Sequence, residues 1–417
     1  MSATTLTYAN AMPAPTWYRL KDMSDTNIEL AELPQADAGT QTFETDAAGA
    51  AGDFDAAMDA AQAEWLAAHP EPFLTTAMVD EGKDPDAVYG GTALSKYQRE
   101  SDEIESAKDL RVSFETGVGA EAFEYMRARA AATWNVTSAA GSTAAANLHL
   151  DAVDGAVNIA AVDVVAGANS ELTVIVSVDS PKGGQGIVGT SMRVFADKGA
   201  RVHIIRTQTS DATFTDLDDM GLFTADGAFI DVRQTVLGAA KAYTGLAGDI
   251  RGNASRIDID ARYLGTGDRS LDFNYELRHH GQKTESHING NGVLAGESKK
   301  SMRQTIDLVR GCKGAVGAET ETVLLADEDV RNNTVPAILC NEDDVMGNHG
   351  ATIGHVRPEQ LFYLSSRGLS QRDAENMFVR AMLEQAAIDA PDDVSRAGVM
   401  RLGSNLLDNF TDFMDEE

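Results

Sequence analysis

The fold is decided by four short runs: T-V-I-V-S-V at Thr173–Val178, R-V-H-I-I at Arg201–Ile205, F-I-D-V at Phe229–Val232, and R-I-D-I-D at Arg256–Asp260. Apolar and polar residues alternate in each run, which is typical of a strand with one buried face. A small turn sequence precedes each run, at Gly167-Ala168, Gly199-Ala200, Gly227-Ala228 and Gly252-Asn253-Ala254. These turns lie 32, 28 and 25 residues apart, a spacing in the range of stacked repeats.

Two fold classes fit this pattern, a β-solenoid and a β-sandwich. No amphipathic helix of ten residues separates the strands, which disfavours a doubly wound α/β sheet. The solenoid is favoured because one turn-then-strand unit recurs over about two hundred residues. In a solenoid each coil also covers the edge of the coil before it.

Helical patterns flank the strands on both sides. The pattern predicts three regions: residues 1–135 as a loosely ordered lead followed by helices, residues 136–350 as the β-solenoid core, and residues 351–417 as a helical module. Three helices are expected before the core: one with Phe54, Met58, Ala61, Trp65 and Leu66 on one face, one over about 97–112 and one over about 120–134. In the last region Pro358 suits a first helical turn, Gly368 a C-terminal stop, and Ser370 with Asp373 a capping box. That box should open a helix to about Ile388, and a last helix should run from about Asp392 to Phe413.

The charge is strongly acidic, with 65 Asp and Glu against 34 Lys and Arg and a net charge of −31. The acids are spread along the whole chain, which favours a solvated surface of the halophilic kind. Such a surface repels nucleic acid and anionic membranes, so neither is an expected partner. We expect a cytoplasmic location, because we find neither a secretory leader nor eighteen consecutive apolar residues. The two cysteines, Cys312 and Cys340, are expected to be thiols and are too few for a four-thiolate iron–sulfur site.

Two motifs that suggest binding sites have simpler explanations. Gly184, Gly186 and Gly189 satisfy G-x-G-x-x-G, but a strand follows rather than the helix that a dinucleotide site needs, so a turn is expected. No G-x-x-x-x-G-K-[ST] is present, so any ATP hydrolysis must come from a partner. His279, His280 and His287 suggest a metal site, but adjacent residues of a strand point to opposite faces, so turn residues between coils are the favoured interpretation.

The two cysteines differ in their surroundings. Cys312 lies beside Arg310 and Lys313, where positive charge would lower a thiol pKa and favour a possible reactive thiol. A buried structural role for Cys312 is still the simpler interpretation. Cys340 ends the apolar run A-I-L-C, which predicts a small buried core residue.

The stretch from Thr334 to Gly368 holds the most specific motifs. They are D-D-V at Asp343–Val345, H-G-A-T-I-G at His349–Gly354 and E-Q-L-F-Y-L-x-S-R-G at Glu359–Gly368. Upstream lie His279 followed by Ser286, and V-L-A-G-E-S-K at Val293–Lys299. On these residues the chain resembles the SufD family, the subunit that pairs with SufB and the ATPase SufC to build iron–sulfur clusters. The resemblance is most convincing over residues 250–388.

The resemblance implies a right-handed parallel β-helix flanked by helical ends. The neighbours of His349, Asn348 and Gly350, predict that it lies on an exposed turn at the end of the solenoid. The resemblance places His349 at the SufB interface with a role in cluster assembly, with Asp343 and Asp344 at adjacent matching positions, and an imidazole there could bind iron. The resemblance implies a SufC-docking segment that contains Phe362, Tyr363 and Arg367, although these residues could equally pack the helix onto the solenoid. No tightly bound cofactor is expected, only a transient cluster or iron shared with SufB. Many members carry a cysteine two residues before the histidine, where this chain has Gly347.

The resemblance also implies a non-catalytic subunit, with a homodimer as a further possibility when SufB is missing. One rival is a SufB-like cluster scaffold, which should have more cysteines than this chain has. A rival from another class is a carbohydrate-active β-helix enzyme, which should carry exposed carboxylates along one face and a secretion signal.

Overall fold

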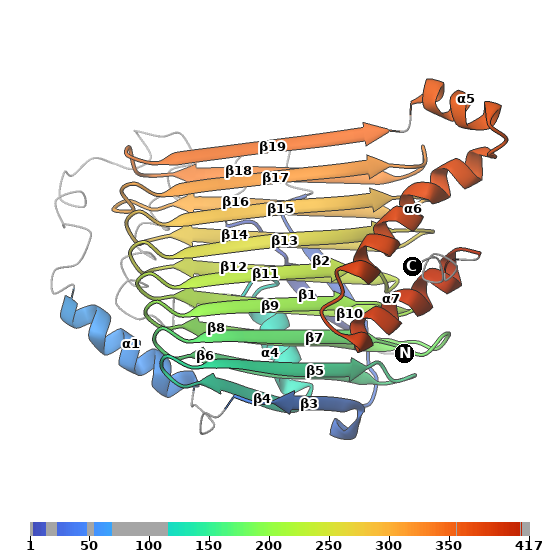
Figure 1. Cartoon of the computed structure of the whole chain (residues 1–417). Coiled ribbons are helices and arrows are strands. Elements are labelled where there is room, and N and C mark those ends of the chain that lie inside the picture. The colour runs from blue at the N-terminus through green and yellow to red at the C-terminus, as the bar shows by residue number, and fades with distance from the viewer. Residues whose placement is uncertain are drawn as a thin grey trace.

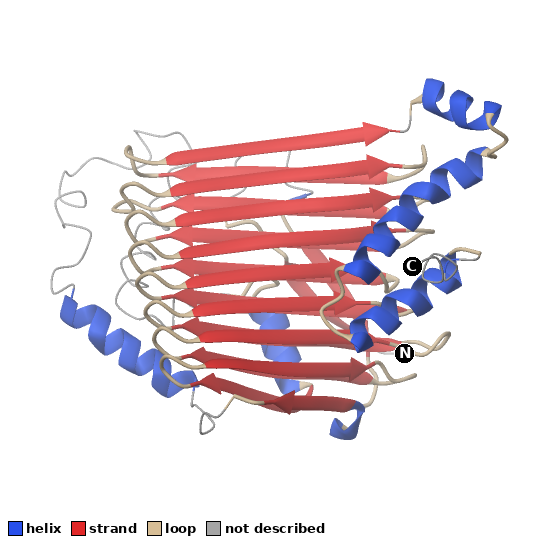
Figure 2. Cartoon of the chain, viewed as in Figure 1, coloured by secondary structure: helices blue, strands red, loops and turns tan. Residues whose placement is uncertain are grey.

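Parallel strands stacked in two sheets form most of the molecule, as a β-solenoid (Figures 1 and 2). The computed structural model describes residues 3–13, 23–47, 54–68, 116–355, 357–408 and 410. The eight-stranded sheet contains, in chain order, β4 Ala130–Ser138, β6 Val157–Ala166, β8 Gly186–Ala196, β10 Phe214–Thr224, β12 Lys241–Ile250, β14 Ser270–His279, β16 Lys299–Leu308 and β18 Arg331–Cys340. The nine-stranded sheet contains β3 Gln41–Thr45, β5 Thr143–Asp151, β7 Glu171–Asp179, β9 Arg201–Gln208, β11 Phe229–Val236, β13 Arg256–Gly265, β15 Glu285–Leu294, β17 Val316–Leu325 and β19 Met346–His355.

The predicted solenoid is confirmed. The four runs that decided the fold are β7, β9, β11 and β13, which are consecutive neighbours in the nine-stranded sheet. The predicted turns before them are turns in the structure, and Gly199 and Gly227 have φ of 66° and 65°. A residue with a Cβ rarely adopts that conformation, which explains why glycine recurs there.

The lumen between the two sheets is filled by rows of stacked side chains. Parallel pairing without register shifts places one residue of each coil above its counterpart in the coil below. One such row is Ala146, Val174, Ile204, Val232, Ile259, Ile288, Glu319 and His349. Its first six members are apolar and almost fully buried. Each buried aliphatic side chain contributes about 1.5–3 kcal/mol relative to exposure, so these rows are the main source of stability.

The N-terminal residues differ from the prediction. β1 Ala3–Ala9 and β2 Thr26–Ala31 form an antiparallel pair, and β3 pairs antiparallel with β5, so a loosely ordered lead is wrong for these strands. Leu6, Ile28 and Leu30 are buried in one cluster with Ile159 and Leu217 of the eight-stranded sheet. These segments are short, and they become strands because they pack on that sheet. The local sequence does not reveal this packing.

The helices before the core follow the prediction in part. α1 Phe54–Ala68 is helical and buries Phe54 and Met58, whereas the side chains of Trp65 and Leu66 lie outside those described. The helix expected over 97–112 also lies outside the described residues. The helix expected over 120–134 is α4 Ala120–Ala128, after which β4 begins. There Trp134 stacks on Phe43 at 4.8 Å between ring centroids, so packing between strands overrides the helical pattern.

Three helices follow the last strand: α5 Pro358–Ser366, α6 Gln371–Ile388 and α7 Asp393–Leu406. The Ser370–Asp373 capping box and the α6 end at Ile388 are as predicted, while α7 ends before Phe413. α6 and α7 pack on the nine-stranded sheet and share a buried cluster with Leu264 and Val293 (Figure 1). α5 projects past β19 at the upper right of Figure 1. No helix within the described residues is long and apolar enough to span a membrane.

Candidate functional site

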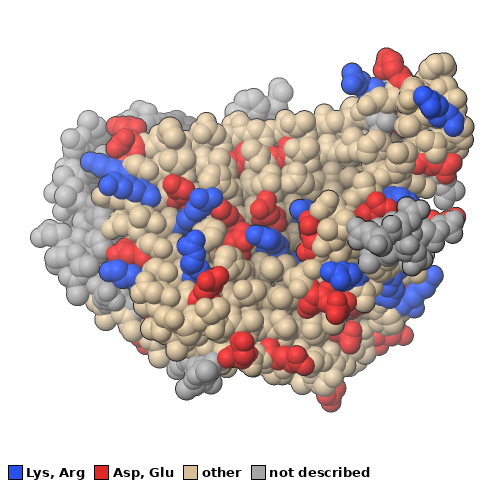
Figure 3. Space-filling view, viewed as in Figure 1, with Lys and Arg blue, Asp and Glu red and all other residues tan. Residues whose placement is uncertain are grey.

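The two ends of the solenoid differ. At the first end, the edge strands are β4, which pairs parallel with β6, and β3, which pairs antiparallel with β5. At the other end, β18 and β19 each pair with one strand only among the described residues. Nearly all of β19 is exposed, and it contains no Lys, Arg, Asp or Glu. The upper part of the face in Figure 3, over β19, is correspondingly uncharged. Exposed edge strands normally carry charges that prevent further pairing, so this edge is unusual. We call β18 and β19 together the open end.

His349 lies in the middle of β19 and not on a turn as predicted. Register places its side chain on the lumen-facing row, directly above Glu319 of β17. Its side chain is 56% exposed because no further coil covers it. Nδ1 of the imidazole lies 4.0 Å from Oε1 of Glu319.

Glu319 is an acid in an otherwise apolar row. Its side chain is fully buried, and neither carboxylate oxygen makes a hydrogen bond of normal geometry. Burial raises the pKa of Glu319 to about 9, and the nearby backbone amide of Ala337 offsets this only in part. The group is therefore mainly uncharged at neutral pH.

A buried ion pair lies one inward position further along β17. Lys300 of β16 donates to Glu321, which also accepts hydrogen bonds from Tyr263 at 2.6 Å and from Thr334. Lys300 and Glu321 are completely enclosed. Burial lowers the pKa of Lys300, although Glu321 acts in the opposite direction. Sequence reasoning missed Glu319, Lys300 and Glu321. The available signal was the alternation in V-G-A-E-T-E-T-V, which puts two acids at inward positions.

The other predicted residues lie around the turn between β18 and β19. Asp343 and Asp344 are exposed there, and the carbonyl of Asp344 accepts from Gly314 N–H at 2.6 Å. Cys340 is exposed, not buried as predicted, because it is a lumen-facing residue of the last coil. Cys312 is buried, and burial raises its pKa to about 12, which favours the structural role over the alternative of a reactive thiolate. Arg310 and Lys313 are close to it in sequence, but desolvation outweighs any effect of their charge.

The remaining motifs are structural. Gly186 and Gly189 lie within β8, as the turn-and-strand interpretation requires. His279 is buried and hydrogen bonds to Thr284 at 2.7 Å and Ser286 at 2.8 Å, while His280 contacts Asp249 at 2.7 Å. Within the part of the chain that the structure describes, no three His, Cys, Asp or Glu residues are grouped to hold a metal.

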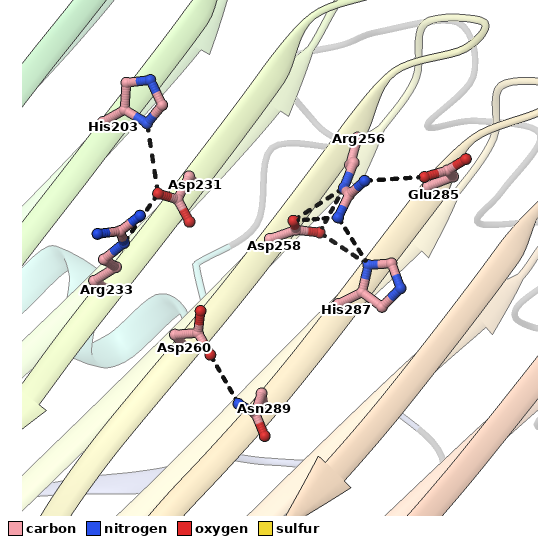
Figure 4. Close-up of polar contacts among 9 residues, drawn as sticks. All are labelled: His203, Asp231, Arg233, Arg256, Asp258, Asp260, Glu285, His287 and Asn289. Carbon is pink, nitrogen blue, oxygen red and sulfur yellow. Dashed lines mark hydrogen bonds and ion pairs between the residues drawn. The ribbon is translucent and has the colours of Figure 1, made fainter.

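A polar strip crosses the outer face of β9, β11, β13 and β15 (Figure 4). Its acids pair with bases or amides on the same or the next coil: His203 Nδ1 lies 3.5 Å from Asp231, His287 Nδ1 lies 3.1 Å from Asp258, and Asn289 donates to Asp260 at 2.9 Å. Burial acts to raise the pKa of Asp231, but hydrogen bonds from His203 and Arg233 lower it overall. A glycosidase acid needs a raised pKa, so this strip is better explained as cross-coil bonding.

α5 presents an apolar surface to solvent. Phe362 is 77% exposed and Tyr363 is 56% exposed, so they do not pack the helix onto the solenoid. The Arg367 guanidinium lies 5.3 Å from the Tyr363 ring centre, a cation–π contact. We call these three exposed residues of α5 and its C-terminal end together the α5 patch.

Comparison with known proteins identifies the family. The model of the SufBD core domain of the SUF system for FeS cluster assembly matches residues 149–382, more than half of the chain. The iron-sulfur cluster assembly protein SufD of Bacillus subtilis is 27% identical over 143 residues, which cover 34% of this chain and 33% of that protein. SufD of Escherichia coli is 25% identical over 186 residues, 44% of each chain. A SufBD family protein of Pyrococcus horikoshii is 28% identical over 144 residues, 34% of this chain and 31% of that protein.

These matches cover less than half the length of each relative, and the family model spans most of the solenoid and the start of the helical module. The solenoid fold, the motifs around His349 and the family model all indicate the same family. The chain belongs to the SufBD family of iron–sulfur cluster assembly proteins.

Proposed function

We propose that the chain is a SufD-type subunit that pairs with a SufB-type partner through its open end and receives a SufC-type ATPase at the α5 patch. The observation that carries this proposal is His349, an exposed imidazole in the last strand of a solenoid whose edge lacks protective charges. A partner strand can add to such an edge by backbone hydrogen bonds. In the absence of that partner, a second copy of the chain could occupy the same edge.

In the proposed complex, the chain supplies surfaces and one imidazole and carries out no reaction alone. Iron or a nascent cluster is the cargo, held transiently between the two solenoids. An imidazole suits that task because it binds iron and also exchanges a proton near neutral pH. Asp343 and Asp344 lie on the turn that leads into β19, where they add negative charge close to the same interface. We assign the protein to the cytoplasm, where reducing conditions keep Cys312 and Cys340 as the free thiols that the structure shows.

The test for pairing uses two isoleucines of similar exposure. Ile353 of β19 is 51% exposed at the open end, and Ile388 at the end of α6 is 65% exposed. Co-expression with SufB-type and SufC-type subunits should give a complex that Ile353→Asp disrupts and Ile388→Asp leaves intact. Equal recovery of the SufB-type subunit with both variants would contradict pairing through the open end.

The α5 patch and His349 are tested in the same complex. Phe362→Ala with Tyr363→Ala should release the SufC-type subunit while the SufB-type subunit stays bound, because the patch lies apart from the β19 edge. His349→Ala should leave the complex assembled and reduce cluster formation. Normal cluster formation by His349→Ala would remove the proposed role of this residue.

A further inference from the structure

Glu319 breaks the pattern of its row. The six positions below it, from Ala146 to Ile288, are apolar, and a seventh apolar residue would continue the packed lumen. Leaving a buried polar group without a partner costs about 1–3 kcal/mol. A position that breaks the local rule at such a cost is expected where a function requires it.

On the opposite wall of the lumen, the backbone amide of Ala337 lies near this acid but makes no hydrogen bond of normal geometry with it. Ile306 lies opposite Gly317, and Met302 lies opposite Gly290, which is in the same row as Glu321. Gln304, between Met302 and Ile306 on β16, therefore lies opposite Glu319. Its Nε2 also lacks a hydrogen bond, so the two groups do not serve each other.

The remaining polar neighbour is His349. Its Nδ1 faces Glu319 Oε1 at 4.0 Å, which leaves Nε2 on the far side of the ring. The gap exceeds a hydrogen bond by about 1 Å, a distance that a small rotation of the exposed ring closes. Among the described residues no other group hydrogen bonds to this imidazole, and its strand neighbours Asn348 and Gly350 are exposed.

We propose that Glu319 is a positioning residue for His349: its carboxyl group accepts the Nδ1–H of the imidazole and so presents the Nε2 lone pair at the open end. A neutral imidazole has one donor nitrogen and one acceptor nitrogen, and the partner of one fixes the role of the other. A carboxylate behind a metal-binding histidine is a recurring arrangement of this kind. The inference rests on the proposed function of His349 and adds the residue that orients it.

The first test measures the His349 tautomer in the isolated chain. ¹⁵N-histidine spectra, with His349→Ala to assign the signals, should show protonated Nδ1 and unprotonated Nε2 in the wild type. Glu319→Gln retains an acceptor and should keep this tautomer, whereas Glu319→Leu should lose it. Glu285→Leu makes the same change at an exposed site of β15 and serves as the control. Two results would overturn the proposal. One is an Nε2–H tautomer in the wild type, which would arise if a protonated Glu319 donated to Nδ1, and the other is an unchanged tautomer in Glu319→Leu.

The second test measures cluster formation by the assembled complex. Loss of an outer carboxylate typically reduces metal affinity or activity by about 10-fold to 100-fold, so Glu319→Leu should lose about that much. Glu319→Gln should retain most of the rate, and equal losses in both variants would show that the acceptor does not matter. Thermal unfolding distinguishes misfolding, because Glu319→Leu extends an apolar row and should be at least as stable as wild type. If the complex with His349→Ala forms clusters at the wild-type rate, the proposed function is wrong. If His349→Ala reduces cluster formation but Glu319→Leu does not, only the positioning role of Glu319 is wrong.

Discussion

The buried pair of Lys300 and Glu321 allows a quantitative prediction. Lys300→Met keeps the length of the side chain and removes its charge, leaving the Glu321 carboxylate enclosed with only the hydroxyls of Tyr263 and Thr334. Breaking one half of a buried ion pair costs about 3–5 kcal/mol. We expect a decrease of that size in the free energy of unfolding.

The double variant Lys300→Met with Glu321→Met should recover most of this loss. Replacement of a whole buried pair by apolar residues is often neutral or stabilising by about 1–4 kcal/mol. Here Tyr263 and Thr334 each lose an acceptor, at about 1–3 kcal/mol apiece, which offsets that gain. The double variant should therefore lie within about 2 kcal/mol of wild type, and the coupling energy should be about 3 kcal/mol or more.

Urea unfolding followed by circular dichroism measures these differences, with Lys299→Met as the matched control. Lys299 is the exposed neighbour on β16, so its substitution should change stability by less than about 0.5 kcal/mol. If Lys300→Met matches that control, or if the two single effects add in the double variant, the argument for a tightly coupled lumenal pair is wrong.

Three further predictions follow from single features. Burial lowers the pKa of His279 to about 3; only the unfolded chain is protonated between about pH 6.5 and 3, so stability should decrease by about 1.4 kcal/mol per pH unit below 6.5. Urea unfolding at pH 7, 6 and 5 should show that the free energy of unfolding depends less steeply on pH in His279→Gln than in wild type. The same slope in both proteins would contradict the prediction. A thiol reagent should modify one cysteine, Cys340, in the native chain and two in urea, since burial raises the pKa of Cys312 to about 12; two rapid reactions in the native chain would contradict the buried position. With a net charge of −31, the unfolding temperature should rise between 0.1 M and 1 M KCl, as the Debye length falls from about 10 Å to about 3 Å, and a flat response would argue against strong self-repulsion.

The solenoid could be predicted because its information is repeated. The turn sequence and the alternating run recur in consecutive coils, so each of the strands β7, β9, β11 and β13 supports the strand prediction made for the others. The α6 helix was equally predictable, since a capping box is a local signal. β1 and β2 were not, because each becomes a strand only by burying Leu6 and Ile28 against a distant sheet.

The candidate site was harder to predict than the fold. Motifs identified His349, but its place in β19 depends on the register of every earlier coil. Glu319 becomes unusual only when that register shows it within an apolar row. The run A-I-L-C predicts a buried Cys340, but the residue is exposed because β18 is the last strand of its sheet and no coil covers it.

The different ends of the nine-stranded sheet bear on how many solenoids the proposed pairing would join. If both ends offered free parallel edges, each bound subunit would expose a new edge, and the assembly could grow as a fibre. In the nine-stranded sheet the strand at the first end is β3, which runs antiparallel to β5 and so does not continue the parallel stack. A partner built on the same plan would also offer one parallel edge of this sheet. If the two sheets paired through these edges, both edges would be used, and this sheet would not extend beyond two solenoids.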